Sequence, residues 1–292
     1  MVQVKSVLKI ALLMFLSIIG SIVPFFFVAP IVRVAYLNYS RLVFWSTFLA
    51  TTGLLFMAGF IPIGISLLGV ILLVGIFSEI YIKYKNMFAS GLIALFISFI
   101  ALVSATQQWL ILKGTTLSVQ LQEQVQLILK QAIQVNPKVK IEPDYLVSLA
   151  PSALMALMLM SLALALILEQ PISRLLNFPL GKTEDLNLLN FKLPDSFIWI
   201  AMVSFLLSFI DIKLNSVSIL ASNLVNLMVV LYFFQGLAVI EVFFTTLKFG
   251  FFIRFMTYVV FLVQLFFLVA AIGVIDFWVE FRKRFVRIRI NQ

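Results

Sequence analysis

The 292-residue sequence contains no cysteine and no histidine. Without cysteine the chain forms no disulfide and has no thiolate nucleophile, and structural zinc sites lose their commonest ligand. Without histidine there is no imidazole proton relay, and haem ligation through either residue is excluded. We therefore expect no cofactor and no metal site.

Charged residues are also scarce. They make up 11% of the chain and hydrophobic residues 63%, whereas a soluble domain has about 25% and roughly 45–50%. Seven long runs carry no charged side chain: Ile10–Val32, Leu42–Ser78, Asn86–Leu112, Tyr145–Leu168, Ser196–Ile210, Leu214–Ile240 and Phe255–Ile275. Because roughly 20 apolar helical residues span a bilayer core of about 30 Å, these runs predict a membrane protein.

The longest run, Leu42–Ser78, would form a helix of about 55 Å, which is too long for one crossing. Gly59, Pro62 and Gly64 interrupt it near the middle, which predicts two helices joined by a tight turn around Ile61–Ile63. Seven runs thereby become eight spans. We expect an all-α fold, a polytopic integral membrane helical bundle that forms one transmembrane domain over residues 1–292.

Two runs leave the number of spans open between seven and nine. Ile10–Val32 contains Pro24 and Pro30, so it forms either one retained first helix or a helix followed by a short broken one ending near Tyr36. Ser196–Ile210 is short for a perpendicular crossing. It either recruits neighbouring residues, thins the bilayer locally or re-enters the membrane from one side.

Positive charge is concentrated at the ends of the runs. The formal net charge is +9, and five basic residues crowd the C-terminal tail, residues 282–292: Arg282, Lys283, Arg284, Arg287 and Arg289. Such clusters anchor a membrane protein on its cytoplasmic side, so we expect the lipid bilayer, and no nucleic acid, as a partner. We expect eight spans with both termini in the cytoplasm; the alternative, a nine-span arrangement, places only the N-terminus there.

Two segments are too polar to span the membrane. In the first, residues 113–144, Thr116–Val135 carries apolar residues at steps of three and four: Leu117, Leu121, Val125, Ile128, Leu129 and Ala132. Gln and Lys occupy the other face, which predicts an extramembrane amphipathic helix lying on the membrane or capping the bundle.

The second polar segment, Gln170–Asp195, is predicted to be a loop because it contains Pro171, Pro179, Gly181 and Pro194. Its Gly181-Lys182-Thr183 sequence resembles the end of a phosphate-binding loop. That motif requires a glycine five positions earlier, where this chain has Leu176. Nucleotide binding at this loop is therefore rejected.

Polar residues gather on one face of the predicted seventh span. At 100° per residue, five of them fall within about 120°: Asn215, Asn223, Asn226, Glu241 and Thr245. Gln235 falls outside this stripe. Because polar side chains within a bilayer are costly, we take Asn215, Asn223, Asn226 and Glu241 as candidate substrate-binding residues. The alternative is that Asn223 and Asn226 only join neighbouring helices.

The remaining charged residues favour no catalytic site. Glu79, close to Lys83 and Lys85, is interpreted as an interfacial helix end. Asp276 and Glu280 are interpreted with Arg282–Arg284 as the amphipathic tail of the last helix, in which Glu280 pairs with Lys283 and Arg284. Since there is no pair of buried carboxylates and no serine with a base, we expect no enzyme.

Four motifs of the C-terminal half occur in the order found in a known family. They are Leu149-Ala150-Pro151-Ser152-Ala153, Phe191-Lys192-Leu193-Pro194, Leu231-Tyr232-Phe233-Phe234-Gln235-Gly236-Leu237-Ala238, and Gly273-Val274-Ile275-Asp276-Phe277-Trp278 before Phe281-Arg282. Over about residues 145–285 the chain resembles the YybS-like family of bacterial inner-membrane proteins. The resemblance implies a multi-pass protein of the bacterial inner membrane.

The same resemblance implies distant similarity to the substrate-binding components of energy-coupling-factor vitamin transporters. Those components dock a coupling subunit through an Ala-x-x-x-Ala pattern in their first helix. Here Phe15 follows Ala11 at that spacing, and only Ser17 and Ser21 offer small residues. The chain departs from the pattern, which leaves the coupling mechanism open.

Two functions of different classes follow. The first is a transport-type protein that binds a small apolar or amphipathic substrate within the bundle and takes its energy from a partner or gradient. The second is a membrane scaffold, a partner-binding subunit of an envelope complex. A gene for a coupling subunit beside this one favours the first, and a gene of a biogenesis complex favours the second.

Overall fold

The computed structural model describes residues 13–14, 16–17, 28–136, 142–178, 191–209, 215–247, 249–250, 253, 256–258, 260–261 and 264–290. Throughout these ranges the regular structure is α-helical, as predicted. The chain divides into two compact units, Met1–Glu184 and Asp185–Gln292.

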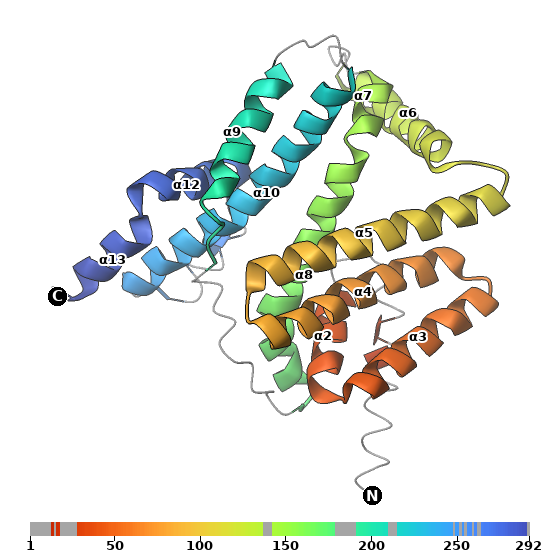
Figure 1. Ribbon diagram of the computed structural model, residues 1–292, viewed down its shortest axis with the longest axis horizontal. Coiled ribbons are helices and arrows are strands. Elements are labelled where there is room, and N and C mark those ends of the chain that lie inside the picture. The colour runs from red at the N-terminus through yellow and green to blue at the C-terminus, as the bar shows by residue number, and fades with distance from the viewer. Residues whose placement is uncertain are drawn as a thin grey trace, which may run out of the picture. The chain divides into compact units, whose positions relative to one another are not determined.

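The helices of the first unit are α2 (Val28–Asn38), α3 (Arg41–Met57), α4 (Ile61–Tyr84), α5 (Met87–Leu112), α6 (Leu117–Val135), α7 (Pro143–Ser148) and α8 (Ala150–Leu175). Figure 1 shows α3, α4 and α5 running back and forth beside one another. Short turns join them, which is why consecutive helices are antiparallel neighbours. The short helix α2 packs against α3, α4 and α8.

The core of the first unit surrounds α2. Most of this helix is buried, including Val32, Val34 and Ala35. Phe44 of α3 and Val74 of α4 belong to the same apolar cluster. The broken first run predicted a short helix ending near Tyr36, and α2 confirms that part of the alternative. The segment before Val28 lies almost entirely outside the described residues.

The predicted break in the longest run is confirmed, although it lies slightly earlier in the chain. The turn comprises residues 58–60, and Gly59 adopts a φ of +83°, which favours glycine. Ile61–Ile63, predicted to be the turn, instead begins α4. Pro62 is suited to that position because the first helical turn leaves its N–H groups unbonded, so proline loses no hydrogen bond there.

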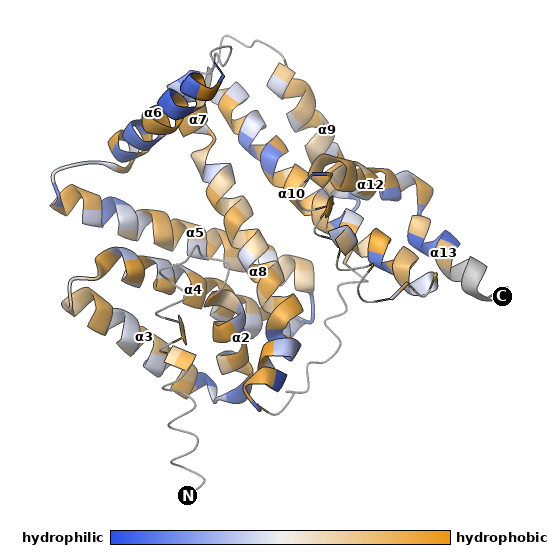
Figure 2. Ribbon diagram, turned by 180° about the vertical axis from the view of Figure 1, so that it is seen from behind, coloured by the Kyte–Doolittle hydropathy of each residue, from blue (hydrophilic) through white to orange (hydrophobic). Residues whose placement is uncertain are grey.

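The amphipathic helix is confirmed as α6. The Thr116 side chain accepts a hydrogen bond from the Val119 N–H at 3.5 Å and so caps its first turn. Leu129 is buried, Leu121 and Val125 are half-buried, and Ile128 is exposed within the unit. Figure 2 shows hydrophilic residues along α6, in contrast to the predominantly apolar helices α4 and α8.

The helix α8 extends further than predicted. Pro171 predicts a loop over residues 170–175, yet these residues form the end of α8. A proline removes one backbone hydrogen bond, but Ile172 packs against the core cluster and Ser173 is buried. These contacts keep the helix intact to Leu175. Gly181-Lys182-Thr183 lies outside the described residues.

The second unit contains α9 (Ser196–Phe209), α10 (Asn215–Thr246), α12 (Phe266–Val279) and α13 (Phe281–Ile290). The sixth and seventh predicted spans correspond to α9 and α10. The predicted eighth span, Phe255–Ile275, is not one continuous helix. Residues 256–258 and 260–261 are helical, the helix is interrupted at Gln264 and Leu265, and α12 then continues four residues beyond that run to Val279. Glu280, at a φ of 50°, separates α12 from α13.

Candidate functional site

An ion pair lies buried in the first unit. Arg33 of α2 donates from Nε to the Glu169 carboxylate of α8 at 3.0 Å, and the two side chains are 3% and 5% exposed. Arg33 also donates from a terminal nitrogen to the Ser78 hydroxyl of α4 at 2.5 Å, and its guanidinium lies 5.7 Å from the centre of the Phe77 ring. One arginine therefore joins three helices.

Such a pair is costly in an apolar interior. Removing both charges from water costs several kcal/mol per ion, and the attraction between them compensates only when their remaining donors and acceptors are also satisfied. Here Ser78 provides one further acceptor, and its hydroxyl in turn donates to the Val74 carbonyl at 2.5 Å. Ionisable groups held in this way within membrane helices are functional candidates by default.

This pair is not evident from the sequence, because both residues adjoin the ends of uncharged runs. Arg33 follows Val32, and Glu169 follows Leu168, so neither residue falls within a predicted span. In the structure α2 continues to Asn38 and α8 to Leu175, which carries both charges inside helices. The available signal was that the two residues have opposite charge and that each lies one residue beyond an apolar run.

A second buried polar network lies in the second unit, around Gln235 of α10. This side chain is 2% exposed. Its oxygen accepts from the Leu193 N–H at 3.0 Å, and its nitrogen donates to the Gly273 carbonyl at 3.0 Å and to Asp276 at 3.4 Å. Gln235 falls outside the predicted polar stripe, yet its side chain bonds both to Leu193, in the segment before α9, and to α12.

Asp276 extends this network to α13. The carboxylate is 3% exposed, and the same oxygen that binds Gln235 accepts from Arg282 at 2.8 and 3.2 Å. Arg282 also donates to the Phe191 carbonyl at 2.8 Å. Asp276, interpreted from the sequence as part of the amphipathic tail of the last helix, is thus buried near the end of α12 and pairs with Arg282 of α13. The predicted pairing of Glu280 with Lys283 is confirmed, at 2.6 Å.

Two glycines position the network. A Cβ atom at Gly236 would collide with the Val269 carbonyl, and one at Gly273 would collide with the Tyr232 carbonyl. The backbones of α10 and α12 therefore approach closely, which brings Gln235 within reach of the Gly273 carbonyl. Three of the four motifs that carry the resemblance therefore meet at this network: Phe191–Pro194, Leu231–Ala238, and Gly273–Trp278 with Arg282.

The residues of the predicted polar stripe on α10 are not among the described contacts of the Gln235 network. Asn223 donates to the Ile219 carbonyl of its own helix at 2.9 Å, and Asn226 is exposed on the surface of its unit. Glu241 accepts a hydrogen bond from the Tyr258 hydroxyl. The backbone of Asn215 begins α10, but its side chain lies outside the described residues. That these residues line a substrate site stays a prediction.

The described helices define a multi-spanning helical membrane protein. Among them α4, α5, α8 and α10 are long and apolar enough to cross a bilayer, and α2, α3, α9 and α12 are shorter apolar helices. Residues 4–277 match the family described as Predicted membrane protein (DUF2232), and the chain belongs to this family. Searches of curated proteins and of solved structures find no match.

Proposed function

We propose that this protein is a transport-type membrane protein that binds a small apolar or amphipathic substrate within its helical bundle. The observation that carries this proposal is the buried Arg33–Glu169 pair. A pair of well-packed apolar residues would hold α2 to α8 at least as firmly, because buried ion pairs are often no more stabilising than hydrophobic replacements. Charges retained at such a cost favour a role in function.

The pair suits a contact that opens and closes. It joins the short helix α2 to α8, and separating these helices exposes two charges that a polar group or water entering the bundle can solvate. A substrate shifts such an equilibrium only by binding the two states with different affinity. In this proposal the open state of the Arg33–Glu169 contact belongs to the transport cycle.

The polar residues of α10 supply the proposed substrate contacts. Asn215, Asn223 and Asn226 offer amide donors and acceptors, and Glu241 offers a carboxylate, on a helix otherwise composed largely of apolar residues. A site with apolar walls and a small number of polar groups suits an apolar or amphipathic molecule. With no nucleotide motif in the sequence, the energy would come from a partner or a gradient. If the resemblance to the YybS-like family extends to the substrate-binding components of energy-coupling-factor transporters, the source of energy would be a coupling partner in the bacterial inner membrane.

The test begins with the native lipid environment. The protein is purified in nanodiscs, the small molecules that accompany it are identified by mass spectrometry, and their uptake is measured in proteoliposomes. We expect Asn223→Leu to abolish retention of such a molecule while leaving the protein folded. We expect the double variant Arg33→Met, Glu169→Met to retain the molecule but not transport it. Equal transport by the double variant and the wild type would remove the basis of the proposal.

The second candidate function is a partner-binding subunit of an envelope complex. It is favoured by the amphipathic helix α6, on which Leu127, Ile133 and Val135 are exposed. In-cell cross-linking of the full chain tests it. The scaffold function would be supported if one partner protein cross-links to α6 in a one-to-one ratio and if the Leu127→Glu variant no longer forms this cross-link. Cross-links spread among abundant membrane proteins would argue against it.

A further inference from the structure

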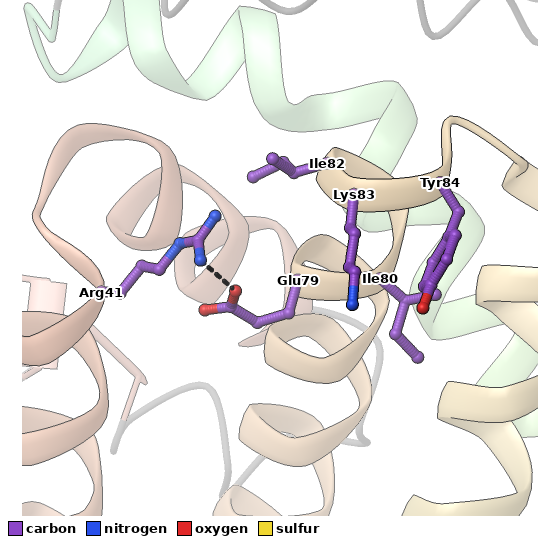
Figure 3. A pocket seen from close by; sticks show the side chains of 6 residues that line it. All are labelled: Arg41, Glu79, Ile80, Ile82, Lys83 and Tyr84. Carbon is purple, nitrogen blue, oxygen red and sulfur yellow. Dashed lines mark ion pairs between the residues drawn. The ribbon is translucent and has the colours of Figure 1, made fainter.

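A cavity opens at one edge of the first unit, between the beginning of α3 and the end of α4. Its volume is about 460 Å³, and its lining residues are Arg41, Glu79, Ile80, Ile82, Lys83 and Tyr84. Figure 3 shows Arg41 and Lys83 on either side of Glu79. We refer to this cavity as the α3–α4 notch.

Glu79 lies at the centre of the notch and contacts residues of α3 through both of its carboxylate oxygens. Its carboxylate pairs with Arg41 at 3.1 Å, and the two side chains are 27% and 62% exposed. The other carboxylate oxygen accepts from the Trp45 indole at 3.4 Å. Because a guanidinium has five N–H donors, one ion pair with Glu79 leaves others for a ligand. Glu79, predicted only to be an interfacial helix end, therefore bonds to both Arg41 and Trp45.

The notch lies where lipid headgroups are expected. α4 is long and apolar enough to span a bilayer, so its end reaches the membrane interface. Aromatic and basic residues mark that level: Lys83 lies 5.0 Å from the Tyr84 ring centre, and Lys85 lies 6.0 Å from that of Tyr81. The apolar side chain of Ile82 is exposed beside the charges.

We propose that the α3–α4 notch binds the headgroup of a monoanionic phospholipid, with its phosphodiester between Arg41 and Lys83. Two cations and one carboxylate give the lining a net charge of +1, which complements the single negative charge of phosphatidylglycerol. The first turn of α3 adds the partial positive charge of a helix N-terminus. An acyl chain descends along the exposed Ile82.

This arrangement discriminates between lipid classes. A zwitterionic phosphatidylcholine has no net charge to complement the lining, and its quaternary ammonium cannot donate a hydrogen bond to Glu79. Inorganic phosphate lacks the acyl chain that Ile82 contacts. A soluble anion would lack this apolar contact, so the proposed occupant is a membrane lipid.

Native mass spectrometry of the full chain tests the proposal. Delipidated protein in detergent is titrated with phosphatidylglycerol or phosphatidylcholine, and the bound fraction is measured for the wild type, Arg41→Gln and Lys83→Gln. The matched control is Lys113→Gln, since Lys113 also lies over an aromatic ring, 4.5 Å from the centre of Trp109, at a helix end. We expect each notch variant to weaken phosphatidylglycerol binding about threefold to tenfold, the scale of one partly exposed charge-assisted contact.

Several results would overturn the proposal. They are equal binding of the two lipids by the wild type, an equal loss in Lys113→Gln and the notch variants, and displacement of the lipid by millimolar inorganic phosphate. Circular dichroism and size-exclusion chromatography establish that each variant is folded. If Arg41→Gln fails to fold because Glu79 loses its partner, Lys83→Gln alone decides, since no ion pair in the described part of the chain involves Lys83.

Discussion

Breaking the Arg33–Glu169 pair should be far more harmful than removing it completely. Glu169→Leu leaves the Arg33 guanidinium buried without its partner, and the cost of an uncompensated buried charge is about 3–5 kcal/mol. Arg33→Met likewise leaves the Glu169 carboxylate buried without its partner, at a similar cost. The Ser78 hydroxyl adds little to the cost because it keeps its hydrogen bond to the Val74 carbonyl.

The double variant Arg33→Met, Glu169→Leu should lie within about 1 kcal/mol of the wild type, because apolar side chains of similar volume fill the site without a charge. The sum of the single costs should then exceed the cost of the double variant by several kcal/mol. Unfolding of the protein by sodium dodecyl sulfate in lipid bicelles, followed by circular dichroism, measures each free energy.

The control is the exposed pair of Lys283 and Glu280, whose side chains are 69% and 49% exposed. Lys283→Gln should change stability by less than about 0.5 kcal/mol, as is usual for surface ion pairs. The reasoning would be refuted if the two buried single variants cost no more than this control. It would also be refuted if their costs simply added in the double variant.

Three further predictions concern packing and topology. Gly236→Ala should destabilise the protein by about 1–3 kcal/mol in the same assay, because the added Cβ collides with the Val269 carbonyl. Gly91→Ala is the control and should be nearly neutral, because the added Cβ would lie 3.9 Å from the Leu162 side chain, an ordinary contact distance. Val125→Glu should speed hydrogen exchange in α6, whereas Gln126→Glu on the exposed face should not. Reporter fusions after the basic tail should be active in the cytoplasm, and activity only outside it would support nine spans.

The secondary structure could largely be predicted because its signals are local. Glycine and proline interrupt Leu42–Ser78 where the chain turns at Gly59, and the apolar spacing of α6 reports its amphipathic face. Pro171 misled the prediction, since its local preference is overridden by the burial of Ser173. Tertiary packing of this kind is invisible in a single sequence.

The buried polar networks could not be predicted for a related reason. Arg33 and Glu169 are 136 positions apart, and neither position reveals that the helices continue past it. Gln235 lies outside the polar stripe of α10, and its importance depends on the close approach of two backbones at Gly236 and Gly273. A helical wheel identifies which residues share a face, but not which face another helix covers.

The most direct test of the proposed function is a high-resolution cryo-electron microscopy map of the full chain in lipid nanodiscs. The account predicts non-protein density beside α10 that contacts Asn223, Asn226 and Glu241, bounded by apolar side chains. The contradicting result is a map in which these three side chains bond tightly to neighbouring helices or face acyl chains, with no enclosed density beside them.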